Sequence, residues 1–166
     1  EGIEYDAKFV FEKVGYNVEG NEVGASFGLT QLKKLNQNIQ TRQNNFNRQF
    51  NFFENHNQFF MNPLQNKNVD TAWLAYPILI KEDAPFTRRE FQIYLEERNI
   101  QTRVVFTGNI LKQPMTKNID KKISEYGYKN SDLIMKQGVL LPVHHGLTDR
   151  MFTRLHRTIN DFLSKF

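Results

Sequence analysis

The sequence predicts an α/β fold: a small two-layer sandwich in which helices cover a short, mainly antiparallel sheet, preceded by a long helix. Three observations support this class. Apolar residues recur at helical spacing from Glu22 to Phe53. A strand-like apolar run follows at Trp73–Lys81, and the chain ends on a helix with one apolar face at 152–163. Helices that alternate with short strands around one core favour a layered α/β domain.

The predicted long helix has its apolar residues at spacings of three, four or sums of these. They are Leu29, Leu32, Leu35, Ile39, Phe46, Phe50 and Phe53. We expect a kink near Asn36. The polar positions between 36 and 68 are mostly Asn and Gln, a bias that also occurs in prion-like tracts. Because the phenylalanines keep helical spacing, we expect these amides on the solvent side of an ordinary helix.

The rest of the chain is predicted to contribute about three strands and three helices. Pro77 inside the first strand indicates an edge position or a bulge. Thr87 and Glu90 have the spacing of a capping box, so a helix begins there and ends near Asn99. The remaining elements are a strand at 102–106, an irregular segment at 115–128, a short helix capped by Asn130 or Ser131, a strand at 139–143 and a last helix capped by Thr148.

Composition bounds the kind of protein. The chain has 166 residues, 39% of them hydrophobic, which is enough for the core of one globular unit. It has no apolar run of about 20 residues and no signal-like start, so we predict a soluble, cytoplasmic protein without membrane contact. The absence of cysteine rules out disulfides and thiolate metal sites within the chain.

The net charge of +4 raises nucleic acid as a partner. The basic residues, however, occur as scattered pairs such as Lys33–Lys34 and Arg88–Arg89 rather than as one cluster. A mixed, solvated surface explains such a pattern. We therefore predict no nucleic-acid partner.

The most informative stretch is Thr102–Pro114. In a strand, Arg103 and Val105 would share one face, so the Arg103 guanidinium lies either at a sheet edge in water or opposite an anion. Gly108-Asn109 can adopt positive φ and redirect the chain. The amides of Asn109 and Gln113 add donors and acceptors that suit a polyol or phosphate ligand.

The sequence shows no catalytic apparatus of its own. It contains no nucleophile elbow, no glycine-rich phosphate loop and no paired carboxylates beside a base. His144 and His145 are adjacent on an extended segment and would point opposite ways, so they make a poor metal pair. We predict no metal site and no catalytic residue in these 166 residues.

Four motifs together resemble a known family. They are Gly15-Tyr16-Asn17, the helix Gly28-Leu29-Thr30-Gln31-Leu32-Lys33-Lys34-Leu35, Pro85-Phe86-Thr87-Arg88, and Gly108-Asn109-Ile110-Leu111-Lys112-Gln113-Pro114. This set resembles the DegT/DnrJ/EryC1/StrS family of sugar-modifying enzymes, which use pyridoxal phosphate (PLP) and have the aspartate aminotransferase fold. Within the family it is most similar to the nucleotide-sugar 3-dehydratases, among them the branch that acts on CDP-4-keto-6-deoxyglucose.

The resemblance implies a division of the chain. Residues 1–28 would end a large cofactor-binding domain that is otherwise missing, 29–60 would form a connecting helix, and 61–166 the small carboxyl-terminal domain. The cofactor, PLP or pyridoxamine phosphate (PMP), and the catalytic residues would belong to the large domain, so the chain alone should be inactive. Asn17 would bind the cofactor phosphate of the neighbouring subunit in a homodimer.

The resemblance also implies that Arg103, Asn109 and Gln113 face a nucleotide sugar. The intact protein would then be a 3-dehydratase of a 4-keto-6-deoxyhexose in dideoxysugar synthesis for lipopolysaccharide O-antigen. An iron–sulfur cluster, with no ligands in this chain, and a reductase partner are further implications for the intact protein. The alternatives are a sugar aminotransferase of the same family, a non-catalytic basic binding module and a dimerisation domain.

Overall fold

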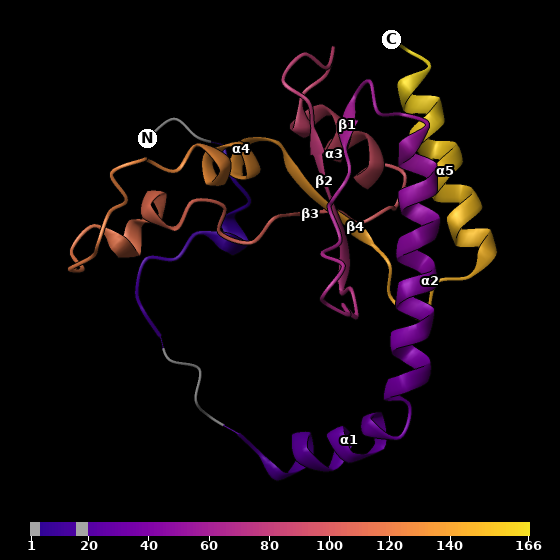
Figure 1. Ribbon diagram of the computed structural model, residues 1–166, viewed down its shortest axis with the longest axis horizontal. Coiled ribbons are helices and arrows are strands. Elements are labelled where there is room, and N and C mark those ends of the chain that lie inside the picture. Colours follow the sequence, from indigo (N-terminus) through magenta and orange to yellow (C-terminus); the bar gives the residue numbers. More distant parts are fainter. Residues whose placement is uncertain (1–3, 16–19) are drawn as a thin grey trace.

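The computed structural model describes residues 4–15 and 20–166. The fold is mixed α/β, with helices packed on a small sheet and one helix, α1, projecting from the body (Figure 1). The helices are α1 (Glu22–Leu32), α2 (Leu35–Glu54), α3 (Arg88–Glu96), α4 (Lys129–Gln137) and α5 (Asp149–Leu163), with short 3-10 turns η1 (Ala7–Phe9), η2 (Ile110–Lys112) and η3 (Pro114–Thr116). The strands are β1 (Phe60–Met61), β2 (Ala75–Ile80), β3 (Arg103–Val104) and β4 (Gly138–Pro142).

The sheet is antiparallel throughout and has the strand order β1-β2-β4-β3. Its centre is the β2–β4 pair, in which Tyr76 lies opposite Leu141 and Ile78 opposite Val139. These four side chains point to the same face, because partners across an antiparallel pair share a face. That face carries the hydrophobic core.

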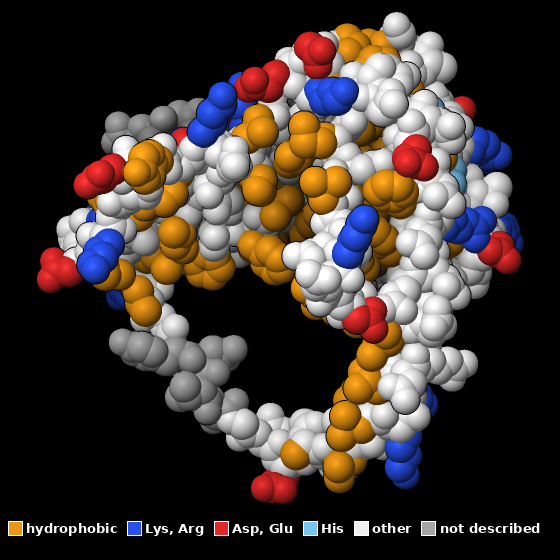
Figure 2. Space-filling view, in the orientation of Figure 1, with side chains coloured by type: hydrophobic (Ala, Val, Ile, Leu, Met, Phe, Trp, Pro, Cys, Tyr) orange, Lys and Arg blue, Asp and Glu red, His pale blue; other side chains and the backbone are white. Residues whose placement is uncertain are grey.

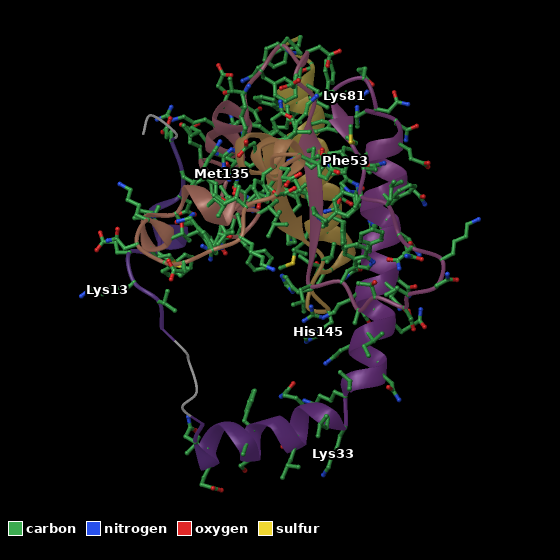
Figure 3. The ribbon with its side chains drawn as sticks, turned by 60° about the vertical axis from the view of Figure 1, so that its left-hand side comes forward. Lys13, Lys33, Phe53, Lys81, Met135 and His145 are labelled. Atoms are coloured by element: carbon green, nitrogen blue, oxygen red, sulfur yellow. The ribbon has the colours of Figure 1, made fainter. Side chains whose placement is uncertain are left out.

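Helices α2, α3 and α5 cover the core face and supply most of its aromatic packing (Figure 1). Phe53 of α2 is fully buried and lies between this helix and the sheet (Figure 3). Its ring meets Phe60 edge-on at 5.1 Å and stacks on Tyr76 at 5.5 Å. Burying aromatic side chains of this size contributes about 2–3 kcal/mol each, so this cluster is the main stabilising feature of the fold.

Two helix signals read from the sequence are confirmed. Thr87 caps α3 and forms the complete capping box with Glu90. Thr148 caps α5, and its predicted inner face is buried along its whole length. Both helices begin where local side-chain chemistry satisfies the first backbone N–H groups.

The predicted single long helix is instead two helices that meet at Lys33–Lys34, a few residues before the expected kink (Figure 3). Of its predicted apolar face, Phe46 and Phe53 are buried, whereas Leu29 and Leu32 are 65% and 62% exposed. Helix α1 buries no residue among the described parts of the chain. The periodic pattern thus continues through the break, although only its second half packs against the core.

The prediction that the amides of this region lie on the solvent side is wrong for two of them. Asn45 and Gln49 of α2 are buried. The Asn45 side chain donates to the backbone oxygen of His144 at 3.0 Å, and the Gln49 side chain donates to that of Pro142 at 3.3 Å. These bonds satisfy carbonyl groups where β4 ends, and they tie α2 to that end of the sheet.

Three further expectations about the sheet and its neighbours needed correction. A fourth strand, β1, follows α2, in addition to the three strands that were predicted. The strand with Pro77 lies inside the sheet rather than at its edge, but β1 pairs only with Leu79 and Ile80, so among the described residues no strand flanks Pro77 on that side. Helix α4 begins at Lys129, and its N-cap residue, Tyr128, makes no side-chain capping bond.

Candidate functional site

Arg103 lies on β3, the outer strand next to β4, as the edge interpretation predicted. Its neighbour Val104 points into the core face and is buried. Arg103 points the other way, in register with Leu140 and Pro77 across the sheet, and all three side chains are partly buried. The guanidinium is therefore displayed on the sheet face that the three core helices leave free.

The start of β3 is held firmly by α3. The backbone N–H of Thr102 donates to the Glu96 carboxylate at 2.5 Å, and the Thr102 hydroxyl donates to the same oxygen at 3.0 Å. Gln92 adds a bond to the Thr102 hydroxyl at 3.0 Å. No ion pair joins Arg103 to another residue in the ranges 4–15 and 20–166. A fixed backbone thus presents a permanently charged group with bonding capacity left over.

The chain turns sharply after β3, as the glycine predicted. The Gly108 N–H donates to the Val105 oxygen at 3.0 Å, and Gly108 has φ of 61°. A Cβ at this position would overlap the side chain of Met135 in α4. Glycine is required here both for its conformation and for the close approach. Asn109, by contrast, has an ordinary φ of −81°.

Asn109 is buried, and both ends of its amide are bonded within the chain. The oxygen accepts from the Leu111 N–H at 3.0 Å, which caps η2, and the nitrogen donates to Asp132 at 2.8 Å. Lys112 also contacts Asp132 at 2.8 Å. The bonds from Lys112 and Asn109 lower the pKa of the Asp132 carboxyl. Asn109 therefore joins the turn to α4.

Gln113 is likewise buried and bonded on both sides. Its nitrogen donates to the Thr107 oxygen at 3.1 Å, and its oxygen accepts from the Phe11 N–H at 3.1 Å. The backbone oxygen of Phe11 in turn accepts from the Met115 N–H at 2.8 Å. The two amides hold the loop in shape, and direct contact of either with a ligand stays a prediction. Asn17, the predicted cofactor contact, lies outside the described residues.

Sequence reasoning did not single out a cleft of about 940 Å³, which lies on the other side of β3 from the Arg103 side chain. Thr102 and Val104 line one wall, and Arg88 and Tyr5 line another. Burial lowers the pKa of Arg88, and its Nη1 atom is buried without a hydrogen-bond partner among the described residues. A second cleft of about 880 Å³ lies around Tyr128. Neither of these two clefts is lined by Arg103, Asn109 or Gln113.

The described residues do not by themselves form a cradle for PLP. Enzymes that use this cofactor surround its ring, commonly with a lysine at the reactive carbon and a charged partner for the pyridine nitrogen. Arg103 instead lies on an open sheet face, and both clefts are open and lined by charges of both signs. No group of three or more His, Asp or Glu side chains within the described parts of the chain could hold a metal ion. None of the helices described is long and apolar enough to cross a membrane.

Known proteins are similar to this chain in both sequence and fold. The chain is 31% identical over 161 residues to dTDP-4-dehydro-2,6-dideoxy-D-glucose 3-dehydratase of Saccharopolyspora spinosa, which covers 97% of this chain and 34% of that protein. It is 30% identical over 144 residues to the lipopolysaccharide biosynthesis protein RfbH of Salmonella typhimurium, which covers 87% of this chain and 33% of RfbH. The chain thus spans about a third of the length of these relatives.

Solved structures agree with these sequence matches. The GDP-4-keto-6-deoxy-D-mannose 3-dehydratase of E. coli, which contains hydrated PLP, superposes with a TM-score of 0.76 and 25% identity over 87% of this chain and 36% of its own. A mutant of such a dehydratase with bound GDP-perosamine gives the same TM-score and identity. The profile of the DegT/DnrJ/EryC1/StrS aminotransferase family matches residues 1–160. This chain belongs to the DegT/DnrJ/EryC1/StrS aminotransferase family.

Proposed function

We propose that the chain is the carboxyl-terminal part of a nucleotide-sugar 3-dehydratase that uses PLP or PMP. Its substrate is a nucleotide-linked 4-keto-6-deoxyhexose, and its place is dideoxysugar synthesis for lipopolysaccharide O-antigen. One observation carries the proposal: relatives named as 3-dehydratases of dTDP- and GDP-linked keto sugars match this chain, one of them over 97% of its length. The RfbH match supports the lipopolysaccharide context.

The surface of α1 supports a missing large domain. Val23, Phe27, Leu29 and Leu32 are 62–81% exposed and lie around the helix rather than along one stripe. A helix that is apolar on all sides belongs inside a larger protein. Figure 2 shows a row of hydrophobic side chains where α1 meets α2, and further hydrophobic side chains on the edge of the body that faces α1. Relatives three times as long have the material to cover this surface.

The family membership and this exposed surface support the division of the chain that we propose. Residues 1–28 end the cofactor domain, 29–60 connect, and 61–166 form the small domain. The cofactor and the catalytic groups then belong to the large domain, and the isolated chain is inactive. Asn17 contacts the cofactor phosphate across a homodimer. A cytoplasmic location, an iron–sulfur cluster and a reductase partner remain predictions for the intact protein, and this chain has no cysteine to offer a cluster.

Arg103 is the residue we propose to meet the substrate. Its guanidinium lies on the free sheet face, beside the apolar side chains of Leu140 and Pro77, without an ion-pair partner among the described residues. A planar cation of this kind binds a diphosphate through two parallel hydrogen bonds. We propose that Asn109 and Gln113 belong to the same substrate-facing surface as Arg103, which we call the substrate wall. Their hydrogen bonds within the chain support this role, because they fix the shape of the loop that follows β3.

The proposal is tested first on the chain itself. The 166-residue chain is incubated with PLP or PMP and with dTDP-, GDP- or CDP-linked 4-keto-6-deoxyhexose, and mass spectrometry follows loss of the C3 hydroxyl. We expect no turnover, because the catalytic groups lie elsewhere. Full turnover by the chain alone would refute the assignment of catalysis to a missing domain.

A sugar aminotransferase of the same family is the closest alternative. The solved aminotransferases that resemble this chain are 13–18% identical, so their likeness shows the fold alone. The residue that faces the cofactor in the upstream sequence separates the two functions: histidine supports dehydration, and lysine supports transamination. A basic nucleic-acid module would instead bind generic DNA with affinity that falls steeply with salt. We expect weak DNA binding without a steep slope, since Arg48, Arg89 and Lys112 are each paired with an acid.

A further inference from the structure

Phe106 occupies a backbone conformation that its side chain disfavours. It has φ of 46° and forms the first central position of the turn from Val105 to Gly108. A turn with positive φ there normally has glycine, asparagine or aspartate at that position. A bulky residue in this region is a true outlier, and such strain gathers at functional sites.

The Phe106 ring makes few packing contacts that could offset the strain in its backbone. Phe106 is 64% exposed. Its aromatic neighbour among the described residues is Phe9, met edge-on at a centroid distance of 6.5 Å. A buried contact would explain a strained phenylalanine, but this side chain projects toward solvent.

The surrounding structure nevertheless holds the turn in this form. The Tyr5 hydroxyl donates to the Phe106 oxygen. Gly108 packs directly on Met135, and the Gln113 amide binds the Thr107 oxygen. Strained backbone persists only where its surroundings fix it in several ways. Three independent contacts do so here, and all of them leave the Phe106 ring free.

We propose that Phe106 is a ligand-contacting residue whose ring receives the flat apolar face of a ring in a nucleotide sugar. This inference rests on the proposed function and adds a second contact to the wall that carries Arg103. A nucleotide sugar joins an anionic diphosphate to a planar base and a hexose. Arg103, three positions earlier in the sequence, would supply the cation for the diphosphate, and the exposed Phe106 ring would supply the apolar surface for the base or the hexose.

The test uses the 166-residue chain and saturation-transfer NMR with GDP-mannose, GDP and mannose 1-phosphate as probes. Transfer to GDP but not to mannose 1-phosphate identifies the base as the contact, and the reverse pattern identifies the hexose. We expect Phe106→Gly to raise the Kd at least about fivefold, the lower end for loss of one stacked ring. Because glycine relieves the strain, the same variant should unfold about 2–4 °C higher.

Two variants separate the contact from its structural alternatives. Phe106→Leu keeps the strained backbone and removes the aromatic face, so it should weaken binding without the gain in thermal midpoint. Asn99→Gly is the matched control, because Asn99 is the other non-glycine residue with positive φ in the described ranges, at 55°, and lies at the end of α3. It should gain stability and leave the Kd unchanged.

The outcomes distinguish this inference from the proposed function. If Arg103→Ala weakens binding while Phe106→Gly leaves the Kd unchanged, the proposed contact of Phe106 with the ligand is refuted, and the proposed substrate role of Arg103 is kept. If Phe106→Gly lowers the thermal midpoint, the ring serves the fold or an interface, and the inference fails. If none of the probes receives saturation from the unaltered chain, the proposed substrate role of Arg103 fails, and the proposed contact of Phe106 fails with it.

Discussion

Substituting Gly108 by alanine probes the turn on which the proposed site depends. Alanine at a φ of 61° costs about 1–2 kcal/mol in strain. The new Cβ would also overlap the Met135 side chain, and its α-carbon lies at 2.9 Å, so overpacking adds about 1–3 kcal/mol. Alanine returns up to about 1 kcal/mol by restricting the unfolded chain. We expect a net loss of about 2–4 kcal/mol in the free energy of unfolding, measured by urea denaturation with far-ultraviolet circular dichroism.

Gly127 supplies the matched control for this prediction. It has a φ of 71°, and a Cβ there would meet no atom of the described residues within 4 Å. Gly127→Ala should therefore lose only the strain, about 1 kcal/mol after the gain from the unfolded state. If the two variants lose the same stability, the close packing of the turn on α4 is refuted, and the account of the site's geometry with it.

Three further predictions concern local bonds. Burial lowers the pKa of His156 to about 4, so below pH 6.5 this ring binds more protons in the unfolded state than in the folded state. The contribution of His156 to stability should be constant above pH 7 and fall by about 1–2 kcal/mol between pH 6.5 and 4, after screening of this partly exposed ring, and His156→Gln should reduce that fall in urea melts across pH. Gln113→Leu removes the partners of the Phe11 N–H and the Thr107 oxygen, which should cost about 1–3 kcal/mol by the same melts; an unchanged midpoint would contradict the loop-holding role. Thr87→Ala breaks the α3 capping box and should cost about 1 kcal/mol, with serine as the variant that retains stability.

Elements with local signals were predictable from the sequence. The capping residues of α3 and α5 lie next to their helices, and the inner face of α5 follows one helical period. A kink was predicted near Asn36, and the break lies close by at Lys33–Lys34; its exact position has no local signal, because neither lysine is a helix breaker and the apolar spacing continues across it. Strand β1 has only two residues and exists through its pairing with β2, which a local pattern cannot reveal.

For the candidate site, too, local sequence patterns predicted some features, whereas tertiary contacts decide the others. Alternation in the strand placed Arg103 opposite the buried Val104, and the structure confirms this. The bonds of Asn109 to α4 and of Gln113 to Phe11 join residues 23 and 102 positions apart, so spacing in the sequence could not foresee them. Phe106 was read only as part of a strand face, since its positive φ is imposed by tertiary contacts.

The short outer strands have a consequence for how this chain meets copies of itself. Both edges of the sheet, β1 and β3, pair through two residues each, and β3 leads at once into a tight turn. Long, regular edges are the templates on which sheets grow from one molecule to the next. Both edge strands of this sheet are too short for that, so self-association should proceed through the exposed apolar side chains of α1 rather than by strand addition. Aggregates of such a chain should lack the cross-β signature of amyloid.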